Sequence, residues 1–408
     1  MKGTISMEFV VGIDSKEHDE FVKKHPLSNL LQSSKWAQVK DNWDHEIVGV
    51  KENGVLIASA SVLIKRLPLS FSILYTPRGP VMDFNNTELV RCFFQGMKHF
   101  ARSQHAIYLT MDPAVHCNDY TLEEANENRY DNCDKIIRML QQIGASFKGY
   151  TKSIDDTIQP RYHANVYAAE DFRENLPKSA RKALNIADKK MLQAETCEFD
   201  NIHSFAEVMH HTEARKNIAL RGENYFKKLM QVYGEDAVIY LIRIPLKELY
   251  DDSIVKLKEN EKALAECPEN AKKKRFTLEE QHASYNREVS DLAKLVEQCG
   301  NSVIGAGALC VKFGKDAELL YAGMDDTYKR YMAPYLAFYK CMEWSFTHGC
   351  SSCNMGGVEG ELKGGLTKFK ANFHPVINEY IGEFDIVYHK LFYRIIMKLL
   401  SRRKKHST

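Results

Sequence analysis

The feature that most constrains the fold is an order of strands and helices that occurs twice along the chain. Each half contains a strand with a Leu-Tyr pair, an amphipathic helix, and a buried strand that opens into a loop. We expect these elements at residues 72–75, 88–102 and 106–111 in the first half and at residues 318–322, 334–347 and 352–355 in the second. A duplicated α/β domain is the simplest explanation of such a repeat.

The elements around the repeat complete a mixed α/β pattern. Strands are expected at residues 46–51, 55–64 and 302–313, with Asn53-Gly54 as the hairpin turn between the first two. Further helices are expected at residues 21–32, 36–39, 133–142 and 179–191. A chain of 408 residues is long enough for two or three such domains.

The segment from Leu246 to Gln298 differs from the rest in composition. It is rich in Lys, Glu, Ala and Leu, and its apolar residues recur at helical spacing on both sides of Pro268. This pattern predicts two antiparallel helices that extend from the body as an arm. The tip carries a basic tetrad of Lys272, Lys273, Lys274 and Arg275. We favour a docking arm for an anionic partner over an inert insertion.

A second basic segment lies on the helix expected at residues 179–191. Arg181 and Lys182 on this helix are candidates for contact with phosphate groups, and an ordinary exposed helix face is the alternative. The 56 basic residues nearly balance the 54 acidic ones. A polyanion must therefore be bound by local patches and not by a general positive field.

In the stretch from Asn354 to Glu383, five glycines at positions 356 to 365 precede Lys368, Phe369 and Lys370. Glycine permits positive φ and close approach of the backbone. We therefore expect a loop folded against a bound ligand, followed by a fixed cation. The glycines do not fit the phosphate-binding pattern in which Lys and then Ser or Thr follow the last glycine directly. This disfavours a nucleoside triphosphatase.

Cysteines and apolar segments bear on the compartment. The ten cysteines are scattered without a framework of close pairs, and no N-terminal stretch resembles a signal peptide, which together predict the reducing cytosol. Cys350 and Cys353 have no second pair at zinc spacing, so we expect a structural role and no metal site. No apolar run is long enough to span a bilayer. The C-terminal segment at residues 391–405 joins an apolar face to a basic end, which fits contact with an anionic membrane surface or a docked final helix.

The repeated pattern suggests the N-acetyltransferase fold, whose coenzyme A donor is bound through the signature [RQ]-x-x-G-x-[GA]. The nearest approach to this signature runs from Gln141 to Ser146, ends in Ser, and lies at the end of an expected helix. A donor other than acyl-coenzyme A is therefore expected, and we expect no cofactor.

Five blocks of the sequence carry a family resemblance. They are Leu31 to Lys40 (with Trp-Ala-Gln-Val-Lys), Pro77-Arg78-Gly79-Pro80, Asp156 to Arg161, Tyr321-Ala322-Gly323-Met324-Asp325 and Asn354 to Glu383. Together they resemble the Fem family of peptidoglycan aminoacyltransferases, most of all its MurM branch, from about Leu27 to Phe384. The resemblance implies two tandem acetyltransferase-like (GNAT) domains with a coiled-coil arm. The first is expected at residues 1–150, completed by residues 384–408, the second at residues 151–383, and the arm at residues 246–300.

The resemblance also implies a reaction. The donor is an aminoacyl-tRNA, and the acceptor is the ε-amino group of the stem-peptide lysine in lipid II or in UDP-MurNAc-pentapeptide. The product is an amide-linked branch that starts an interpeptide bridge, with alanine or serine favoured as the amino acid. An aminoacyl ester is already activated, so aminolysis needs alignment, an uncharged amine and a cation beside the developing oxyanion, but no ATP site.

The family match assigns catalytic roles. Lys370, directly after Phe369, matches the lysine that stabilises the oxyanion, and Lys368 is its competitor two residues away. Asp112 matches a strand end in the first domain and is a candidate base for the lysine amine. A structural Asp-Pro turn is the alternative for Asp112, and a substrate phosphate or water is the alternative base.

The match also assigns acceptor contacts. Lys40, Arg221, Tyr225 and Tyr321 match positions that hold the muramyl peptide and its diphosphate, for which cations and phenols are suitable partners. Tyr108 matches a strand that lines the same cleft. Without the resemblance, a surface ion pair for Arg221 and a core position for Tyr321 would be preferred.

The expected protein is thus a cytoplasmic aminoacyltransferase at the membrane face that adds the first amino acid of the bridge. Its tRNA is expected to contact the basic tetrad of the arm, together with Arg181 and Lys182. Two alternatives stay open. One is an acyl-coenzyme A N-acyltransferase of the same fold, and the other is a non-catalytic tRNA-binding scaffold.

Overall fold

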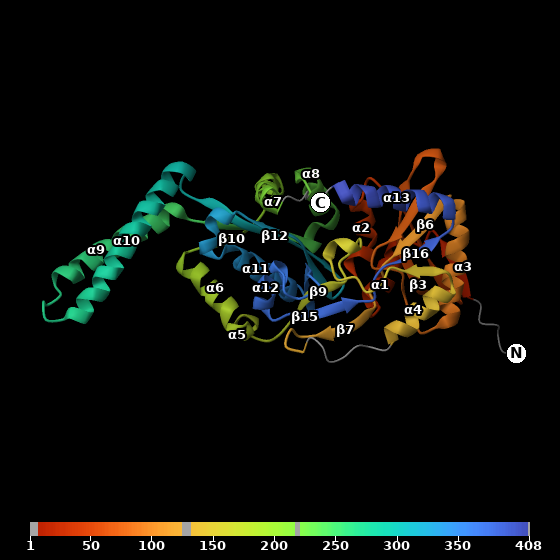
Figure 1. The fold of residues 1–408 in the computed structure, drawn as a ribbon, viewed down its shortest axis with the longest axis horizontal. Coiled ribbons are helices and arrows are strands. Elements are labelled where there is room, and N and C mark those ends of the chain that lie inside the picture. The colour runs from red at the N-terminus through yellow and green to blue at the C-terminus, as the bar shows by residue number, and fades with distance from the viewer. Residues whose placement is uncertain (1–6, 125–131, 217–220, 407–408) are drawn as a thin grey trace.

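The computed structural model describes residues 7–124, 132–216 and 221–406. Two mixed β-sheets lie next to each other with helices on their faces, and a pair of long helices extends from the far end of the second sheet (Figure 1). The α/β class and the repeated order of elements are as predicted from the sequence.

The first sheet has the strand order β1-β2-β3-β4-β6-β16-β8, with β5 paired to β3. Its strands are β1 (Met7–Val11), β2 (Asp44–Glu52), β3 (Val55–Arg66), β4 (Ser72–Thr76), β5 (Val81–Met82), β6 (Ala106–Met111), β8 (Ala145–Phe147) and β16 (Phe384–Val387). Its helices are α1 (Ser15–Lys24), α2 (Ser34–Val39), α3 (Thr87–Ser103), α4 (Asn132–Gln142) and α13 (Lys390–His406). The apolar face of α3 buries Phe93, Met97 and Phe100 in the core of this sheet.

The second sheet has the strand order β10-β11-β12-β13-β14-β9-β15-β7. Its strands are β7 (His116–Tyr120), β9 (Tyr162–Tyr167), β10 (Gln193–Thr196), β11 (Ala237–Ile244), β12 (Val303–Phe313), β13 (Asp316–Met324), β14 (Ser352–Gly357) and β15 (Val376–Tyr380). Its helices are α5 (Phe172–Asn175), α6 (Lys178–Lys189), α7 (Ile202–Lys216), α8 (Glu223–Tyr233), α11 (Ala333–Thr347) and α12 (Gly365–Lys370). The almost wholly apolar helix α11 packs Ala337, Phe338 and Met342 into the core.

The two halves of the repeat differ at one point. In each sheet an antiparallel pair leads into a parallel pair, β3-β4-β6 in the first and β12-β13-β14 in the second. The pairing of β4 with β6 runs along β4 from Ser72 to Thr76. By contrast, β13 pairs with β14 only from Asp316 to Glu318, and then the strands separate. The second sheet therefore opens where the first stays closed.

The sheets also exchange strands. β7 follows the strands of the first sheet in sequence but pairs with β15 in the second. In return, β16 near the C-terminus pairs with β6 and β8 in the first sheet. One strand within residues 1–150 thus belongs to the second sheet, and the domain limits themselves stay a prediction.

The prediction of a helix at residues 21–32 is wrong in its extent. Helix α1 spans Ser15–Lys24, and a separate 3₁₀ turn spans Leu30–Gln32. The Asp14 carboxylate accepts hydrogen bonds from the backbone N–H groups of Lys16 and Glu17 at 2.9 and 3.1 Å, and this cap fixes the start of the helix. Pro26 fixes its end, because the residue before a proline disfavours helical backbone angles.

The arm consists of α9 (Leu246–Ala265) and α10 (Lys272–Cys299), which pack against each other. Figure 1 shows the pair extending away from the body. At its base, Leu246, Leu249 and Leu292 are buried together with two tyrosines of the second domain. Between the helices, Asn260 is buried and donates a hydrogen bond to Gln281 Oε1 at 3.4 Å. A buried polar pair of this kind fixes the register of two helices.

One cysteine pair departs from the sequence expectation. Cys117 on β7 and Cys133 on α4 form a disulfide. The prediction that the cysteines form no close pairs is therefore wrong for these two. The pair was not evident in the sequence because the chain folds back between them and α4 packs on β7.

Candidate active site

Lys370 is the cation around which the site is built. It ends helix α12, is only 6% exposed, and donates a hydrogen bond from Nζ to the Gly357 carbonyl oxygen at 2.7 Å. Its competitor Lys368 is exposed to solvent. Burial therefore distinguishes the two lysines and favours Lys370 as the fixed cation.

Phe369 holds α12 in place. Its ring packs against Tyr335 and Phe338 of α11, with centroid distances of 5.0 and 4.9 Å, and against Phe373 at 5.9 Å. Such aromatic contacts stabilise a short helix that has too few turns to be stable by itself. Phe369 thus fixes the direction in which the neighbouring Lys370 enters the sheet.

The glycine-rich loop packs against the protein itself. The Glu359 carboxylate accepts hydrogen bonds from the backbone N–H groups of Leu366 and Thr367 at the start of α12. A Cβ on Gly364 would lie 2.1 Å from the Glu359 carboxyl carbon, so a larger residue there would displace the Glu359 side chain. Gly364 thus leaves room for Glu359 to cap α12. Contact of the glycines with a bound ligand stays a prediction.

Lys370 lies at the opening between β13 and β14. Gly356 has φ +82°, and a Cβ built on it would lie 3.7 Å from Lys370 Nζ and 3.8 Å from the Leu319 carbonyl oxygen. The ammonium group is thus beside the first β13 residue beyond the paired segment. Among the described residues, no strand pairs with the edge of β13 that faces away from β12 beyond Glu318.

A cavity of about 520 Å³ follows this open edge between α11 and α12. It is mainly apolar and is lined in part by Ala322, Gly323, Met324, Ala337, Phe338, Leu366 and Phe369. A strand edge offers backbone N–H and C=O groups to an extended ligand. Together with Lys370, this arrangement can align an acyl group and stabilise negative charge on its carbonyl oxygen.

Four residues expected to bind the acceptor lie together on three elements. Lys40 follows α2, Arg221 and Tyr225 lie at the start of α8, and Tyr321 lies on β13. Lys40 Nζ donates a hydrogen bond to the Tyr225 hydroxyl at 2.9 Å. The Arg221 guanidinium lies 5.2 Å from the centre of the Tyr225 ring, and the Tyr225 and Tyr321 rings are 5.9 Å apart. We call these four residues the cationic cluster.

Among the residues that the structure describes, neither Lys40 nor Arg221 forms an ion pair with a carboxylate. Burial lowers the pKa of Lys40 to about 8, and the positive charge of Arg221 lowers it in the same direction. Lys40 Nζ also lies over the Trp36 ring, 4.2 Å from its centre. An anion bound here would relieve the repulsion between the two cations, so the geometry fits a phosphate or diphosphate.

A buried polar group between the domains was missed in the sequence. Arg78 is 2% exposed, and its guanidinium lies 4.0 Å from the centre of the Tyr380 ring. Its Nη2 is 2.7 Å from the Pro160 carbonyl oxygen and 2.9 Å from His163 Nε2. Half-buried Glu318 on β13 is within electrostatic reach of both Arg78 and Lys370. The signal in the sequence was an acidic residue inside an otherwise apolar strand, three positions before Tyr321.

Asp112 has both carboxyl oxygens engaged inside the protein. Oδ1 accepts a hydrogen bond from the Arg78 backbone N–H at 2.7 Å, and Oδ2 accepts one from the Tyr75 hydroxyl at 3.1 Å. Burial raises the pKa of Asp112 to about 7, although the charge of Arg78 opposes this rise. The geometry favours the structural alternative, in which Asp112 holds the turn that carries Arg78.

Tyr108 is not part of the cationic cluster. Its ring packs on Tyr393 of α13 at 5.2 Å, and burial raises the pKa of its hydroxyl to about 12. Strand residues alternate between the two faces of a sheet. On β6, Leu109 and Met111 enter the core, so Tyr108 faces α13 instead.

Comparisons with known proteins identify the family. A model of the FemAB family matches residues 13–401. The chain belongs to the FemAB family. The lipid II:glycine glycyltransferase of Staphylococcus epidermidis is 25% identical over 97% of this chain and 96% of its own length. The enzyme of the same name from Staphylococcus aureus is 26% identical, with 96% of each chain covered. The crystal structure of FemX matches with a TM-score of 0.73 and 24% identity over 95% of this chain and 99% of FemX, which supports the fold.

The expected RNA contacts of this FemAB protein lie on exposed helices. Arg181 and Lys182 are exposed on α6, where they help to line a groove of about 430 Å³ with Lys178 and Lys189. The tetrad at residues 272–275 forms the exposed first turn of α10. Cations at a helix N-terminus oppose the helix dipole, at a cost of about 0.3–1 kcal/mol each. Helix stability therefore does not account for this placement.

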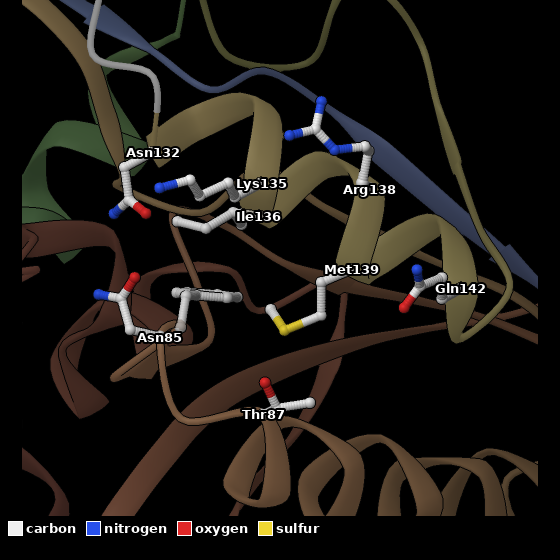
Figure 2. A pocket seen from close by; sticks show the side chains of 9 residues that line it. Asn85, Thr87, Asn132, Lys135, Ile136, Arg138, Met139 and Gln142 are labelled. Atoms are coloured by element: carbon white, nitrogen blue, oxygen red, sulfur yellow. The ribbon is translucent and has the colours of Figure 1, made fainter.

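In the described part of the FemAB chain, one cavity that none of the assigned residues lines has a volume of about 370 Å³. Figure 2 shows it between the start of α3 and α4, with Thr87 and Met139 on opposite sides. No group of three or more His, Cys, Asp and Glu side chains in the described residues is arranged to hold a metal ion. None of the described helices has the length and apolar character needed to cross a membrane.

Proposed function

We propose that this FemAB protein transfers an amino acid from an aminoacyl-tRNA to the ε-amino group of the stem-peptide lysine of lipid II. The observation that carries the proposal is Lys370, a buried cation at the opening between β13 and β14. In aminolysis of an ester, negative charge develops on the carbonyl oxygen, and a fixed cation there lowers the barrier. The cavity along β13, which is lined by Phe369, the chain neighbour of Lys370, is the proposed place of the aminoacyl group.

The cationic cluster supports a diphosphate-bearing acceptor. It lies further along β13, because Glu318 near Lys370 and Tyr321 in the cluster are separated by a strand rise of about 10 Å. The relatives are named for lipid II, whose lipid and sugar are joined by a diphosphate. UDP-MurNAc-pentapeptide carries the same group and is the competing acceptor.

We propose that the transferred amino acid has a small side chain. Alanine or serine is the donor residue we propose, and the first position of the bridge is the place of addition. Glycine, which appears in the names of the relatives, is the competing amino acid. A mainly apolar cavity next to Lys370 favours an uncharged side chain in each case.

The tRNA is proposed to bind along the arm and α6. The Lys190 ammonium forms an ion pair with Glu288, so the end of α6 contacts α10. From Glu288 to Arg275, α10 extends about 20 Å, which places the basic tip well away from the body. An extended RNA helix is a partner of the right charge and length.

Replacing Lys272, Lys273, Lys274 and Arg275 by alanine is expected to weaken tRNA binding without loss of the fold. The residues are exposed, so stability should change little. Each lost phosphate contact should reduce the slope of log affinity against log salt by about 0.7–0.9. Filter binding of charged tRNA at several salt concentrations measures both effects. An unchanged slope would exclude the tetrad from RNA contact.

Contact with the membrane is proposed through α13. Phe392 and Tyr393 pack on the first domain, whereas Leu391, Ile395 and Leu399 are 68%, 48% and 55% exposed. The basic end at residues 402–405 was expected to meet anionic lipid, but its side chains lie outside the described residues. An apolar face beside basic residues matches a helix that lies in a membrane surface.

Changing Leu391, Ile395 and Leu399 together to Ser is expected to lower binding to anionic phospholipid vesicles at least about tenfold. Val255→Ser, on the arm and 53% exposed, is the matched control and should bind normally. Co-sedimentation with vesicles measures the difference. Equal binding by the triple variant would contradict a role of α13.

The transfer itself is tested with a panel of charged tRNAs. Radiolabelled alanyl-, seryl- and glycyl-tRNA are each offered with lysine-containing lipid II and with UDP-MurNAc-pentapeptide. Label on one acceptor from alanyl- or seryl-tRNA is the expected result. Label only from glycyl-tRNA would correct the amino acid, and transfer from no tRNA would overturn the proposal.

An acyl-coenzyme A donor is the second candidate, because the cavity along the open edge of β13 fits the acyl group of a thioester as well as that of an ester. The signature-like segment at residues 141–146 does not support it. It lies at the end of α4, where Gly144 has φ +95°, and not at the start of a helix where backbone N–H groups would face a pyrophosphate. Adding acetyl-coenzyme A to the panel tests this candidate directly. A non-catalytic scaffold predicts tRNA binding with no transfer.

A further inference from the structure

The opening between β13 and β14 has a second side, where Glu318 lies. We propose that Glu318 is the base that accepts a proton from the acceptor ammonium group, and that the small cavity beside it receives the end of the acceptor side chain. The inference rests on the proposed aminoacyl transfer and names the residue that makes the amine nucleophilic.

The position of Glu318 on β13 carries the argument. It is the last residue of β13 that pairs with β14, opposite Asn354, and the carbonyl oxygen of the next residue lies beside Lys370. Leu319 packs into the core toward α11. Because successive strand residues point to opposite faces, Glu318 faces the interface with the first domain. Acid and cation thus approach the same opening from opposite sides of the sheet.

The cavity on the Glu318 side has a volume of about 130 Å³. It lies between Ser28 and Asn29 of the first domain and Glu318 and Asn354 of the second. At about 30 Å³ for each water molecule, it holds roughly four waters or the end of one side chain. The Oγ of Ser28 and the Oδ1 of Asn165, which both line it, are buried without a hydrogen-bond partner. Both atoms can accept a hydrogen bond from an ammonium group.

The two cavities are therefore suited to different substrates. The larger apolar one, on the α11 side, is suited to the aminoacyl ester, and the smaller polar one is suited to an amine. Where β13 and β14 part, Glu318 and Lys370 lie within electrostatic reach of each other. An amine that enters past Glu318 approaches a carbonyl group whose oxygen is next to Lys370, which is the alignment that aminolysis needs.

The charges around Glu318 are compatible with this role. The charged and titratable groups around it, among the described residues, are Arg78, His116, His163, Tyr167, Tyr233, Asp316, Lys370, Cys353 and Tyr380. Burial raises the pKa of Glu318 to about 7, and Arg78 and Lys370 limit that rise. Burial and the same two cations hold the pKa of His163 well below its usual value, so this imidazole stays neutral. A carboxylate with a pKa near neutrality is an effective proton acceptor.

The proton balance is complete without a further reactant. One ammonium proton passes to the Glu318 carboxylate, and the nitrogen lone pair forms a C–N bond to the ester carbon. The C–O bond to the tRNA ribose then breaks, and the ribose oxygen takes the second proton from nitrogen. The third proton stays on the amide, and Glu318 returns its proton to solvent.

The test compares Glu318→Gln with the unsubstituted enzyme in transfer to lipid II, from about pH 6 to about pH 9. The rate constant for transfer near neutral pH is expected to fall roughly 100-fold, with tRNA affinity and acceptor KM within about threefold. The unsubstituted enzyme should gain activity as Glu318 ionises and then reach a plateau. The variant should keep rising toward the pKa of a free lysine amine, about 10.4.

Two control variants separate the base from its surroundings. Glu195→Gln, on the distant edge strand β10, should transfer at the normal rate. Asp112→Asn removes the other carboxyl group whose pKa is raised to about 7, and its pH profile should keep the same midpoint. A profile that moves with Asp112 and not with Glu318 would overturn the inference.

A second measurement does not depend on the Gln variant being well folded. Glu318→Asp keeps a carboxylate and should keep the plateau in the pH profile at a lower rate. An acceptor with sulfur in place of the lysine γ-methylene has a less basic amine. With this acceptor, the rate of transfer by Glu318→Gln should be at least about tenfold higher than with the lysine acceptor. Normal transfer by Glu318→Gln would overturn the inference and leave the proposed function standing. So would an equal change in rate for Glu318→Gln and the unsubstituted enzyme with this acceptor. No transfer by the unsubstituted enzyme would overturn the proposed function and the inference with it.

Discussion

Replacing Lys370 by Met is expected to lower aminoacyl transfer by roughly 10²–10³-fold. Met keeps much of the length and apolar contact of the side chain but removes the ammonium group beside Gly356 and Leu319. The transition state then loses the cation proposed to face its oxyanion, whereas the basic surfaces proposed to bind tRNA are unchanged. Single-turnover transfer, with tRNA binding measured in parallel, separates the two effects.

Lys368→Met is the matched control for this prediction. Lys368 has the same charge and lies on the same short helix, but its side chain is exposed. Transfer by this variant should stay within about threefold of normal. Loss of activity in Lys368→Met with survival in Lys370→Met would reverse the choice between the two lysines. Normal transfer by both variants would mean that neither lysine of α12 stabilises the oxyanion.

The double change Lys40→Met and Arg221→Met should raise the KM for the acceptor by roughly 10²–10⁴-fold and leave the donor affinity unchanged. Charge-assisted hydrogen bonds to a phosphate contribute about 1.5–3 kcal/mol each, and two are removed. Neither Lys40, which follows α2, nor Arg221, which precedes α8, lines the cavity assigned to the aminoacyl group. Steady-state kinetics with varied lipid II measures the effect.

The cationic cluster also predicts how the affinity for the acceptor changes with pH. The pKa of Lys40 is lowered to about 8 in the free protein, so its charge is lost as the pH rises through that value. A bound diphosphate favours the charged form and raises the pKa again. Acceptor affinity should therefore decline above about pH 8, and the decline should be absent in the single variant Lys40→Met. A decline that persists in the variant would assign it to another group.

The repeated strands were predictable because local patterns determine them. Apolar runs bounded by turns place β6 at residues 106–111, and Asn53 and Gly54 both adopt the positive φ of the expected hairpin turn. The extent of α1 was not predictable from apolar spacing alone. The spacing continues past Lys24, whereas a side-chain cap and a proline decide the ends.

The site was predictable only where the family motif covers it. The sequence could not separate Lys370 from Lys368 by spacing, and burial in the three-dimensional structure does so. Arg78 and Glu318 were missed because their partners are distant in sequence, as in the contact of Arg78 with His163. The contact of Tyr108 with α13 was not predictable from the sequence, because the direction of a buried strand residue depends on its register.

The exchange of strands between the sheets has a consequence for synthesis on the ribosome. Multidomain chains usually fold their N-terminal domain first, as it emerges. Here the edge of β6 that receives β16 stays without its partner until residues 384–387 have been made. Translation of the intervening residues, 112–383, takes roughly 14–54 s at about 5–20 residues per second. The first sheet therefore cannot be completed until almost the whole mRNA has been translated. A ribosome that stalls while it translates the second domain leaves both sheets of the nascent protein incomplete.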